Sequence, residues 1–149
     1  MSLKSQITEH MNSAMKAGDK ERLKVVRLML AAIKQIEVDK RVELDDAGVL
    51  AVLTKMVKQR RDSIEQFEKG NREDLATIER AEIAVVEGYL PEPLGADELA
   101  AMVDEVIQAT GAESIRDMGK VMGQIKAKAA GRADMGALSA TVKERLNAL

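Results

Sequence analysis

The chain has 149 residues and a formal net charge of −2, and 46% of its residues are hydrophobic. This length and composition suffice for one ordinary domain or two small ones with apolar cores. The absence of cysteine excludes disulfides, thiol catalysis and every zinc site that needs sulfur ligands. No apolar run approaches the roughly 20 residues of a membrane span, and the N-terminal stretch is too polar for a signal peptide. We therefore expect a soluble, cytoplasmic protein without a membrane partner.

The composition predicts an all-α protein. Leucine, alanine, methionine, lysine and glutamate abound, tryptophan is absent, and the only aromatic residues are Phe67 and Tyr89. Apolar residues recur at helical spacing in four segments of an N-terminal helical unit that we expect to span residues 1–90. The first two helices are predicted over residues 3–17 and from residue 20 to about residue 38. The third should end near Gly70, and the fourth should begin after an N-cap at Asn71.

Glu82 lies where the fourth predicted helix should have an apolar residue. The other seam positions of that helix are Leu75, Ile78, Val85 and Tyr89. A carboxylate among apolar neighbours needs a partner of opposite charge. Arg27, within the apolar stretch "VVRLML", is the cation that we expect to form a structural ion pair with Glu82. A catalytic role for Glu82 is the less favoured alternative.

The segment "YLPEPLGADEL" breaks the helical pattern, because Pro91, Pro93 and Gly95 each disfavour continuation of a helix. We place a domain boundary there. Three further apolar stripes follow, and they predict a C-terminal three-helix tail domain over residues 94–149.

Charged residues are unevenly distributed along the chain. Residues 1–70 carry fourteen Lys/Arg against eleven Asp/Glu, residues 71–113 carry two against eleven, and residues 114–149 carry seven against three. This asymmetry is compatible with contact to nucleic acid, and also with contact to partner proteins.

The stretch "MGKVMGQIKAKAAG" in the tail has helical periodicity, yet Gly119 and Gly123 should each cost the helix about 1 kcal/mol relative to alanine. One interpretation is that a neighbouring helix packs closely on the bare backbone. The other is that a sugar-phosphate chain lies there, held by flanking cations. The candidate nucleic-acid-binding residues are Arg116, Gly119, Lys120, Gly123, Lys126, Lys128 and Arg132. Because the tail has no aromatic residue, we expect recognition of helical RNA shape rather than of stacked bases.

Other candidate sites are weaker. A secondary basic patch on the long third helix comprises Lys55, Lys58, Arg60 and Arg61, and a solvated helix face explains it better than an RNA site. The single histidine, His10, has no second histidine or cysteine with which to form a site, so we expect a structural role. Phosphate-loop, dinucleotide and zinc-binding motifs are absent from the sequence. We expect no catalytic residue, no metal and no cofactor.

Four phrases, in this order, resemble the YqeY family over almost the whole chain: "AMKAGDKERLKVVRLMLAAIK", "KMVKQRRDSIEQFEKGNREDLATIERAEI", "GYLPEPL" and "DMGKVMGQIKAKAAGRAD". That family shares its C-terminal region with the tail of GatB, the B subunit of the amidotransferases that act on Glu-tRNA(Gln) or Asp-tRNA(Asn). The resemblance implies a helical tail that contacts tRNA. The matching residues include Gly131, Arg132 and Asp134, in the turn that follows the predicted helix with Gly119 and Gly123. The final segment "MGALSATVKERL" matches more loosely.

The leading hypothesis is a non-catalytic tRNA-binding protein that supports aminoacyl-tRNA amidation or related tRNA metabolism. One alternative is a helical adaptor that docks on an amidotransferase or another component of the translation machinery. A third is a carbon-nitrogen ligase with glutamine as the amide donor, an activity that the resemblance associates with the complete amidotransferase.

Overall fold

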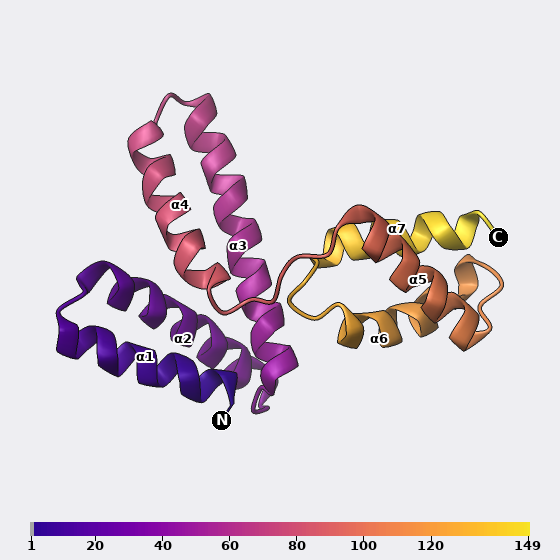
Figure 1. The fold of residues 1–149 in the computed structure, drawn as a ribbon, viewed down its shortest axis with the longest axis horizontal. Coiled ribbons are helices and arrows are strands. Elements are labelled where there is room, and N and C mark those ends of the chain that lie inside the picture. The colour runs from indigo at the N-terminus through magenta and orange to yellow at the C-terminus, as the bar shows by residue number, and fades with distance from the viewer. Residues whose placement is uncertain (1) are drawn as a thin grey trace. The chain divides into compact units, whose positions relative to one another are not determined.

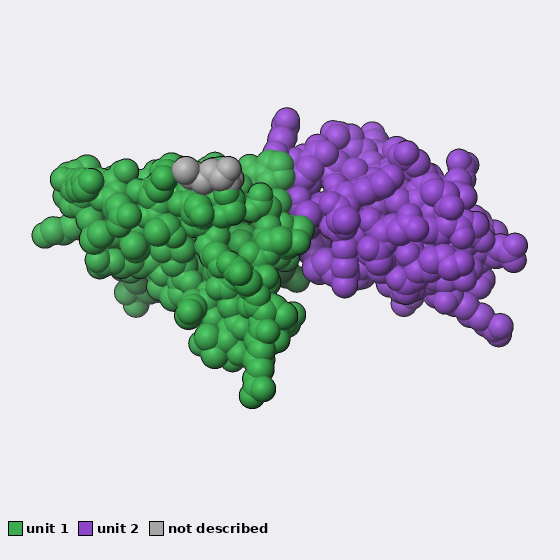
Figure 2. Space-filling view, turned by 90° about the horizontal axis from the view of Figure 1, so that it is seen from below, with its two compact units in different colours: residues 1–91 green, residues 92–149 purple. Residues whose placement is uncertain are grey.

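The computed structural model describes residues 2–149, and within them it contains seven α-helices, one short 3₁₀ helix and no strand (Figure 1). The prediction of an all-α fold is confirmed. The chain divides into two compact units, residues 1–91 and residues 92–149, which Figure 2 shows in different colours. Each unit has its own apolar core.

The first unit begins with two antiparallel helices, α1 (Leu3–Ala17) and α2 (Lys20–Lys40). The hydroxyl of Ser2 accepts a hydrogen bond from the backbone N–H of Ser5 and caps α1. Gly18 ends α1 with a φ of +71°, which glycine adopts without strain. Asp19 then caps α2 by accepting from the N–H of Arg22.

The second helix pair of this unit is α3 (Asp46–Lys69) and α4 (Glu73–Glu87), which pack side by side. Asn71 does not cap α4 as predicted. It adopts the left-handed conformation with a φ of +57°, and Arg72 occupies the N-cap position without a side-chain hydrogen bond. Asparagine tolerates left-handed backbone better than most residues, which explains its place in this turn.

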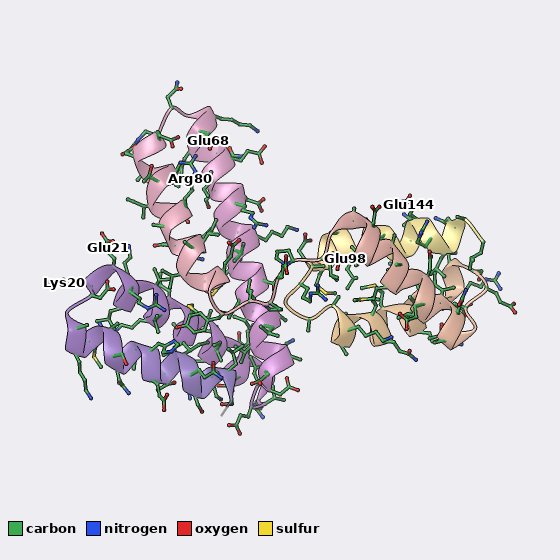
Figure 3. The ribbon with its side chains drawn as sticks, in the orientation of Figure 1. Lys20, Glu21, Glu68, Arg80, Glu98 and Glu144 are labelled. Atoms are coloured by element: carbon green, nitrogen blue, oxygen red, sulfur yellow. The ribbon has the colours of Figure 1, made fainter. Side chains whose placement is uncertain are left out.

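The core of the first unit lies where the two helix pairs meet. Its fully buried side chains come from α1, α2, α3 and α4, and they are Ile7, Val26, Met29, Ile33, Val49, Leu53 and Val86. Toward the turn between α3 and α4, ion pairs join these two helices instead. Arg80 of α4 points toward Glu68 of α3 (Figure 3), and it also pairs with Glu73 at the start of its own helix.

The expected ion pair between Arg27 and Glu82 is not present. Glu82 is buried, as its seam position predicted, but its partner is Arg60 of α3, whose Nε lies 3.0 Å from Oε2 of Glu82. Lys24 of α2 lies 3.7 Å from the other carboxylate oxygen. Arg27 is exposed and donates from Nη2 to the sulfur of Met15 at 3.5 Å. The sequence could not rank these cations, because the choice depends on which helix faces Glu82.

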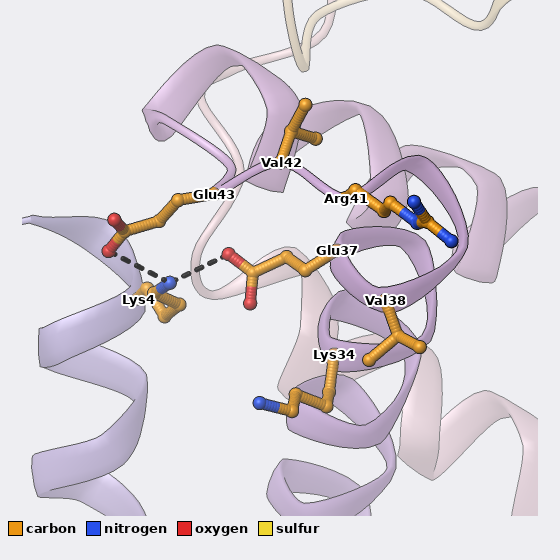
Figure 4. Close-up of a pocket in the computed structure, with 7 residues that line it drawn as sticks. All are labelled: Lys4, Lys34, Glu37, Val38, Arg41, Val42 and Glu43. Atoms are coloured by element: carbon orange, nitrogen blue, oxygen red, sulfur yellow. Dashed lines mark hydrogen bonds and ion pairs between the residues drawn. The ribbon is translucent and has the colours of Figure 1, made fainter.

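Glu37 anchors the connection between α2 and α3. It accepts a hydrogen bond of 2.8 Å from Nζ of Lys4, which also reaches Glu43 at 3.5 Å (Figure 4). It accepts another of 2.8 Å from the backbone N–H of Leu44. The bond from Lys4, followed by that from the backbone of Leu44, lowers the pKa of Glu37 below its ordinary value of 4.5. These contacts fasten the start of α1 to the end of α2.

The second unit contains three α-helices, α5 (Ala96–Thr110), α6 (Met118–Lys128) and α7 (Met135–Asn147). The 3₁₀ helix η1 (Ile115–Asp117) leads directly into α6. Contacts among α5, α6 and α7 enclose one core (Figure 1), whose fully buried side chains are Val103, Val106, Val121, Ile125, Leu138 and Val142.

Candidate nucleic-acid interface

A capping box fixes the entry into the basic helix. The hydroxyl of Ser114 accepts from the backbone N–H of Arg116, and the carboxylate of Asp117 accepts from the N–H groups of Glu113 and Ser114 at 2.8 and 3.4 Å. Those two backbone donors, with a smaller contribution from the nearby charge of Lys120, lower the pKa of Asp117. The ionised carboxylate therefore holds the first turn in place at neutral pH.

Packing of one apolar stripe orients α6. Val121 and Ile125 are fully buried in the core of the second unit, and Ala129 directly after the helix is 2% exposed. The opposite face is consequently turned outward. Its exposed residues are Gly119, Lys120, Gly123, Gln124, Lys126 and Ala127, and Lys128 is exposed in the last turn beside the apolar stripe.

The two glycines lie on this outward face and are not covered. A Cβ atom built on Gly119 or on Gly123 would meet no neighbouring atom within 4 Å, leaving aside the backbone of the helix itself. This finding contradicts the interpretation that a neighbouring helix packs closely on the bare backbone. With Ala127 one turn further on, the glycines form a row of small residues at four-residue spacing, about 6 Å per step along the axis. We call this the small-residue row.

Cations flank the small-residue row on both sides. At 100° per residue, Lys120 and Lys126 each lie about 60° from Gly123, in opposite directions. Both are exposed, and within residues 2–149 neither lies within 4.0 Å of a carboxylate oxygen. Lys128 is also exposed, but its Nζ lies 3.9 Å from Glu105. Arg116, on η1, is exposed and forms no ion pair in the described part of the chain.

Arg132 differs from the other predicted contact residues because its side chain donates a hydrogen bond to the backbone of its own unit. Its Nε donates to the carbonyl oxygen of Glu92 at 2.8 Å, and Nη2 lies 3.6 Å from a carboxylate oxygen of Glu98. Its side chain is only 32% exposed. The residue joins the segment before α5 to the turn after α6.

The secondary basic patch does not form a continuous cationic surface. Arg60 pairs with buried Glu82, and Arg61 pairs with Glu87 at 2.8 Å, so both guanidinium groups join α3 to α4. Only Lys55 and Lys58 of the four predicted residues are exposed without an ion pair among the described residues. The acidic side chains of α4 thus neutralise much of the positive charge of α3.

Gln124 and Ala127 also lie on the outward face of α6, although they were not among the predicted contact residues. Their wheel positions opposite the apolar stripe were the available signal for both. No group of three or more His, Asp or Glu side chains within residues 2–149 is arranged to hold a metal ion. None of the helices described is both long enough and apolar enough to cross a membrane.

His10 of α1 contacts Tyr89, at the other end of the first unit's sequence. Its Nδ1 lies 2.6 Å from the hydroxyl of Tyr89, and the ring centroids are 5.4 Å apart. The bond ties α1 to the residues that follow α4.

Comparison with known proteins assigns the chain to a family. A sequence model of the YqeY family, described as Yqey-like protein, matches residues 4–146. The chain therefore belongs to the YqeY family, and the resemblance noted from its sequence phrases is confirmed. The likeness of the second unit to the amidotransferase tail stays a prediction.

Several fungal proteins are similar to the chain. One is altered inheritance of mitochondria protein 41, mitochondrial, from Lachancea thermotolerans, with 36% identity over 87 residues, which is 58% of this chain and 46% of that protein. Its namesake from Eremothecium gossypii is 35% identical over 103 residues, 67% of this chain and 56% of that protein. The protein of the same name from Pyrenophora tritici-repentis is 29% identical over 125 residues, which is 83% of this chain and 68% of that protein. The chain spans about half the length of the first two relatives.

The names of these relatives contradict the cytoplasmic location expected from the sequence, because they describe mitochondrial proteins. That expectation had no positive signal behind it. It followed by default from the lack of a recognisable signal peptide or membrane span, and no residue pattern specifies the cytoplasm.

Proposed function

We propose that this protein binds tRNA without catalysing a reaction, and that the outward face of α6 lies against the backbone of a helical part of the RNA. The observation that carries the proposal is the uncovered small-residue row between Lys120 and Lys126. Uncovered glycines allow a bulky polyanion to approach the helix backbone, and the lysines on either side supply charge-assisted contacts to phosphate.

The location of the aromatic residues favours helical over single-stranded RNA. Single-stranded RNA is bound chiefly by stacking of bases on aromatic side chains. Phe67 and Tyr89 both belong to the first unit, so the unit that contains α6 has no stacking platform. Contacts to phosphate and ribose along an RNA helix need only cations and close approach, which α6 offers.

Family resemblance supports tRNA as the particular RNA. The phrase "DMGKVMGQIKAKAAGRAD", which resembles the amidotransferase tail, contains the whole of α6. By this likeness the protein assists amidation of aminoacyl-tRNA or a related step of tRNA metabolism.

A binding titration with fluorescently labelled tRNA tests the proposal. Reversing three charges together, with Lys120→Glu, Lys126→Glu and Lys128→Glu, should weaken binding at least about tenfold at moderate salt, since each phosphate contact contributes to affinity. The matched control is a triple reversal in the first unit, Lys16→Glu, Lys20→Glu and Lys40→Glu. These three lysines are exposed and form no ion pair within residues 2–149, and Figure 3 labels Lys20 at the start of α2.

The two triple variants have the same net charge, so a difference between them isolates the α6 surface from general electrostatics. Equal affinity of both variants would refute the proposal. Absence of tRNA binding by the wild-type protein, with nuclease-resistant capture of an amidotransferase subunit, would favour the adaptor hypothesis. Glutamine turnover by the purified chain would favour the ligase hypothesis.

A further inference from the structure

We infer that Arg132 is a positioning residue that confines the joint between the two units to Leu90, Pro91 and Glu92. The inference goes beyond RNA binding and does not depend on it. It follows from the backbone hydrogen bonds on either side of Pro91.

On the side of the first unit, the chain is fastened up to Leu90. The backbone N–H of Tyr89 donates to the carbonyl of Val86, and that of Leu90 donates to the carbonyl of Glu87, both at 3.0 Å. The hydroxyl of Tyr89 meets His10 at 2.6 Å, and the side chains of Tyr89 and Leu90 pack against the core of the first unit.

On the side of the second unit, fastening begins at the carbonyl of Glu92. This oxygen accepts from Nε of Arg132 at 2.8 Å, and the N–H of Leu94 donates to the carbonyl of Arg132, also at 2.8 Å. The side chain of Leu94 packs against the core of the second unit, and Glu98 at the start of α5 lies 3.6 Å from Arg132. Arg132 therefore holds the segment before α5 through its side chain and its backbone together.

Only a short stretch between these two anchors can rotate. The ring of Pro91 fixes its own φ, and its bulk restricts the ψ of Leu90 to extended values. What remains is mainly the ψ of Pro91 and the torsions of Glu92. The two units consequently rotate about a few backbone torsions at residues 90–92, and not about a long flexible linker.

Pulsed dipolar spectroscopy on a spin-labelled protein tests this inference. The chain has no cysteine, so Lys20→Cys and Glu144→Cys introduce one label on an exposed position of each unit (Figure 3). Arg132→Met keeps an apolar stem but removes the donors. The N–H of Leu94 still donates to the backbone carbonyl of residue 132 in this variant. The substitution should therefore free the chain from Leu90 to Pro93, four residues in place of three, and broaden the distance distribution about 1.15-fold, because the spread of a flexible segment grows with the square root of its length.

Arg116→Met is the matched control, since it removes an exposed arginine of the same unit that forms no ion pair among the described residues. It should leave the distribution unchanged. Arg132→Lys retains the charge but has no Nε–H for Glu92, so it should broaden the distribution as well, with less risk to folding.

An unchanged distribution in both Arg132 variants, with circular dichroism as in the wild type, would overturn the inference. So would a wild-type distribution as broad as that of a variant with residues 91–95 all replaced by glycine. None of these measurements requires RNA, so their outcome is separate from that of the tRNA titration.

Discussion

Arg60 of α3 and Glu82 of α4 form an ion pair in which both side chains are largely withdrawn from water, with 14% and 11% of their surface exposed. The 3.0 Å contact joins the two helices at a position where buried Glu82, beside Ile83 and Val86, would otherwise have only the more distant Lys24 as a partner. Removing one partner of such a pair is costly, because the remaining charge keeps its burial and loses its compensation.

We expect Arg60→Met to lower the free energy of unfolding by about 2 to 3 kcal/mol, somewhat below the range for fully buried pairs because Lys24 remains near Glu82. Arg27→Met is the control, since Arg27 is exposed and, among residues 2–149, its side chain hydrogen-bonds only to the sulfur of Met15. It should change the free energy by no more than about 0.5 kcal/mol. Urea denaturation of both variants measures the difference. An equal change in the free energy of unfolding for both variants would show that the Arg60–Glu82 pair does not stabilise the fold.

The second prediction concerns the glycines of α6. Because a Cβ atom at Gly119 or Gly123 would meet no neighbour, replacement of either residue by alanine should stabilise the protein by up to about 1 kcal/mol, through helix propensity. Gly18→Ala is the contrasting variant. Its site is equally open, but its φ of +71° strains any residue with a Cβ, so it should destabilise.

Thermal or urea unfolding of the three alanine variants tests this ranking. Destabilisation by Gly119→Ala would mean that another part of the protein covers the small-residue row. Bulkier replacements test function separately. Gly119→Leu and Gly123→Leu together should preserve the fold and weaken tRNA binding, since their side chains would stand between the RNA and the helix backbone.

The helix ends could be predicted because capping residues act locally. The prediction was wrong where burial depends on contacts between helices. Ser2, Gly18 and Asp19 act within a few residues of their own position, so their roles as caps can be recognised in the sequence. Ile78 was expected on the buried seam of α4 but is 51% exposed. Ala76, two residues earlier, is fully buried, so the buried face of α4 near the turn follows Ala76 and not the heptad seam through Ile78.

At the candidate site, too, features set by one helix could be predicted from the sequence, whereas contacts between distant residues could not. The outward orientation of Lys120 and Lys126 follows from the apolar stripe of their own helix, which the sequence displays. The engagement of Arg132 with Glu92 joins positions 40 residues apart, and the pairing of Arg60 with Glu82 joins positions 22 apart. Such partners depend on how helices pack, and no local pattern specifies them.

The third prediction concerns pH. The folded-state pKa of Glu37 lies below 4.5, chiefly through the hydrogen bond from Lys4 and then that from the backbone of Leu44. The ionised carboxylate therefore favours the folded state. This contribution is complete above the unfolded pKa and disappears as the pH falls through the folded pKa. The same contact raises the pKa of Lys4 above 10.5, so its contribution is complete below that value and disappears as the pH rises through the folded pKa.

Glu37→Gln should accordingly flatten the loss of stability on the acid side, measured as the free energy of unfolding between about pH 3 and pH 7. Glu43→Gln is the control, because Glu43 is 86% exposed and contacts the same lysine at 3.5 Å. Its acid-side profile should match that of the wild type. If both variants follow the wild-type profile, the bonds to Glu37 contribute nothing to the acid dependence.

The last prediction ranks the lysines of α6 by the salt dependence of tRNA binding. Each lysine that contacts phosphate releases a counterion, so its neutralisation should reduce the slope of log K against log salt by about 1. Lys120→Gln and Lys126→Gln should each show this change. Lys128→Gln should show a smaller one, because Glu105 at 3.9 Å already compensates part of its charge. Lys58→Gln, on the exposed face of α3, is the control and should leave the slope unchanged. A slope that falls equally for all four variants would indicate attraction by overall charge and not a phosphate site on α6.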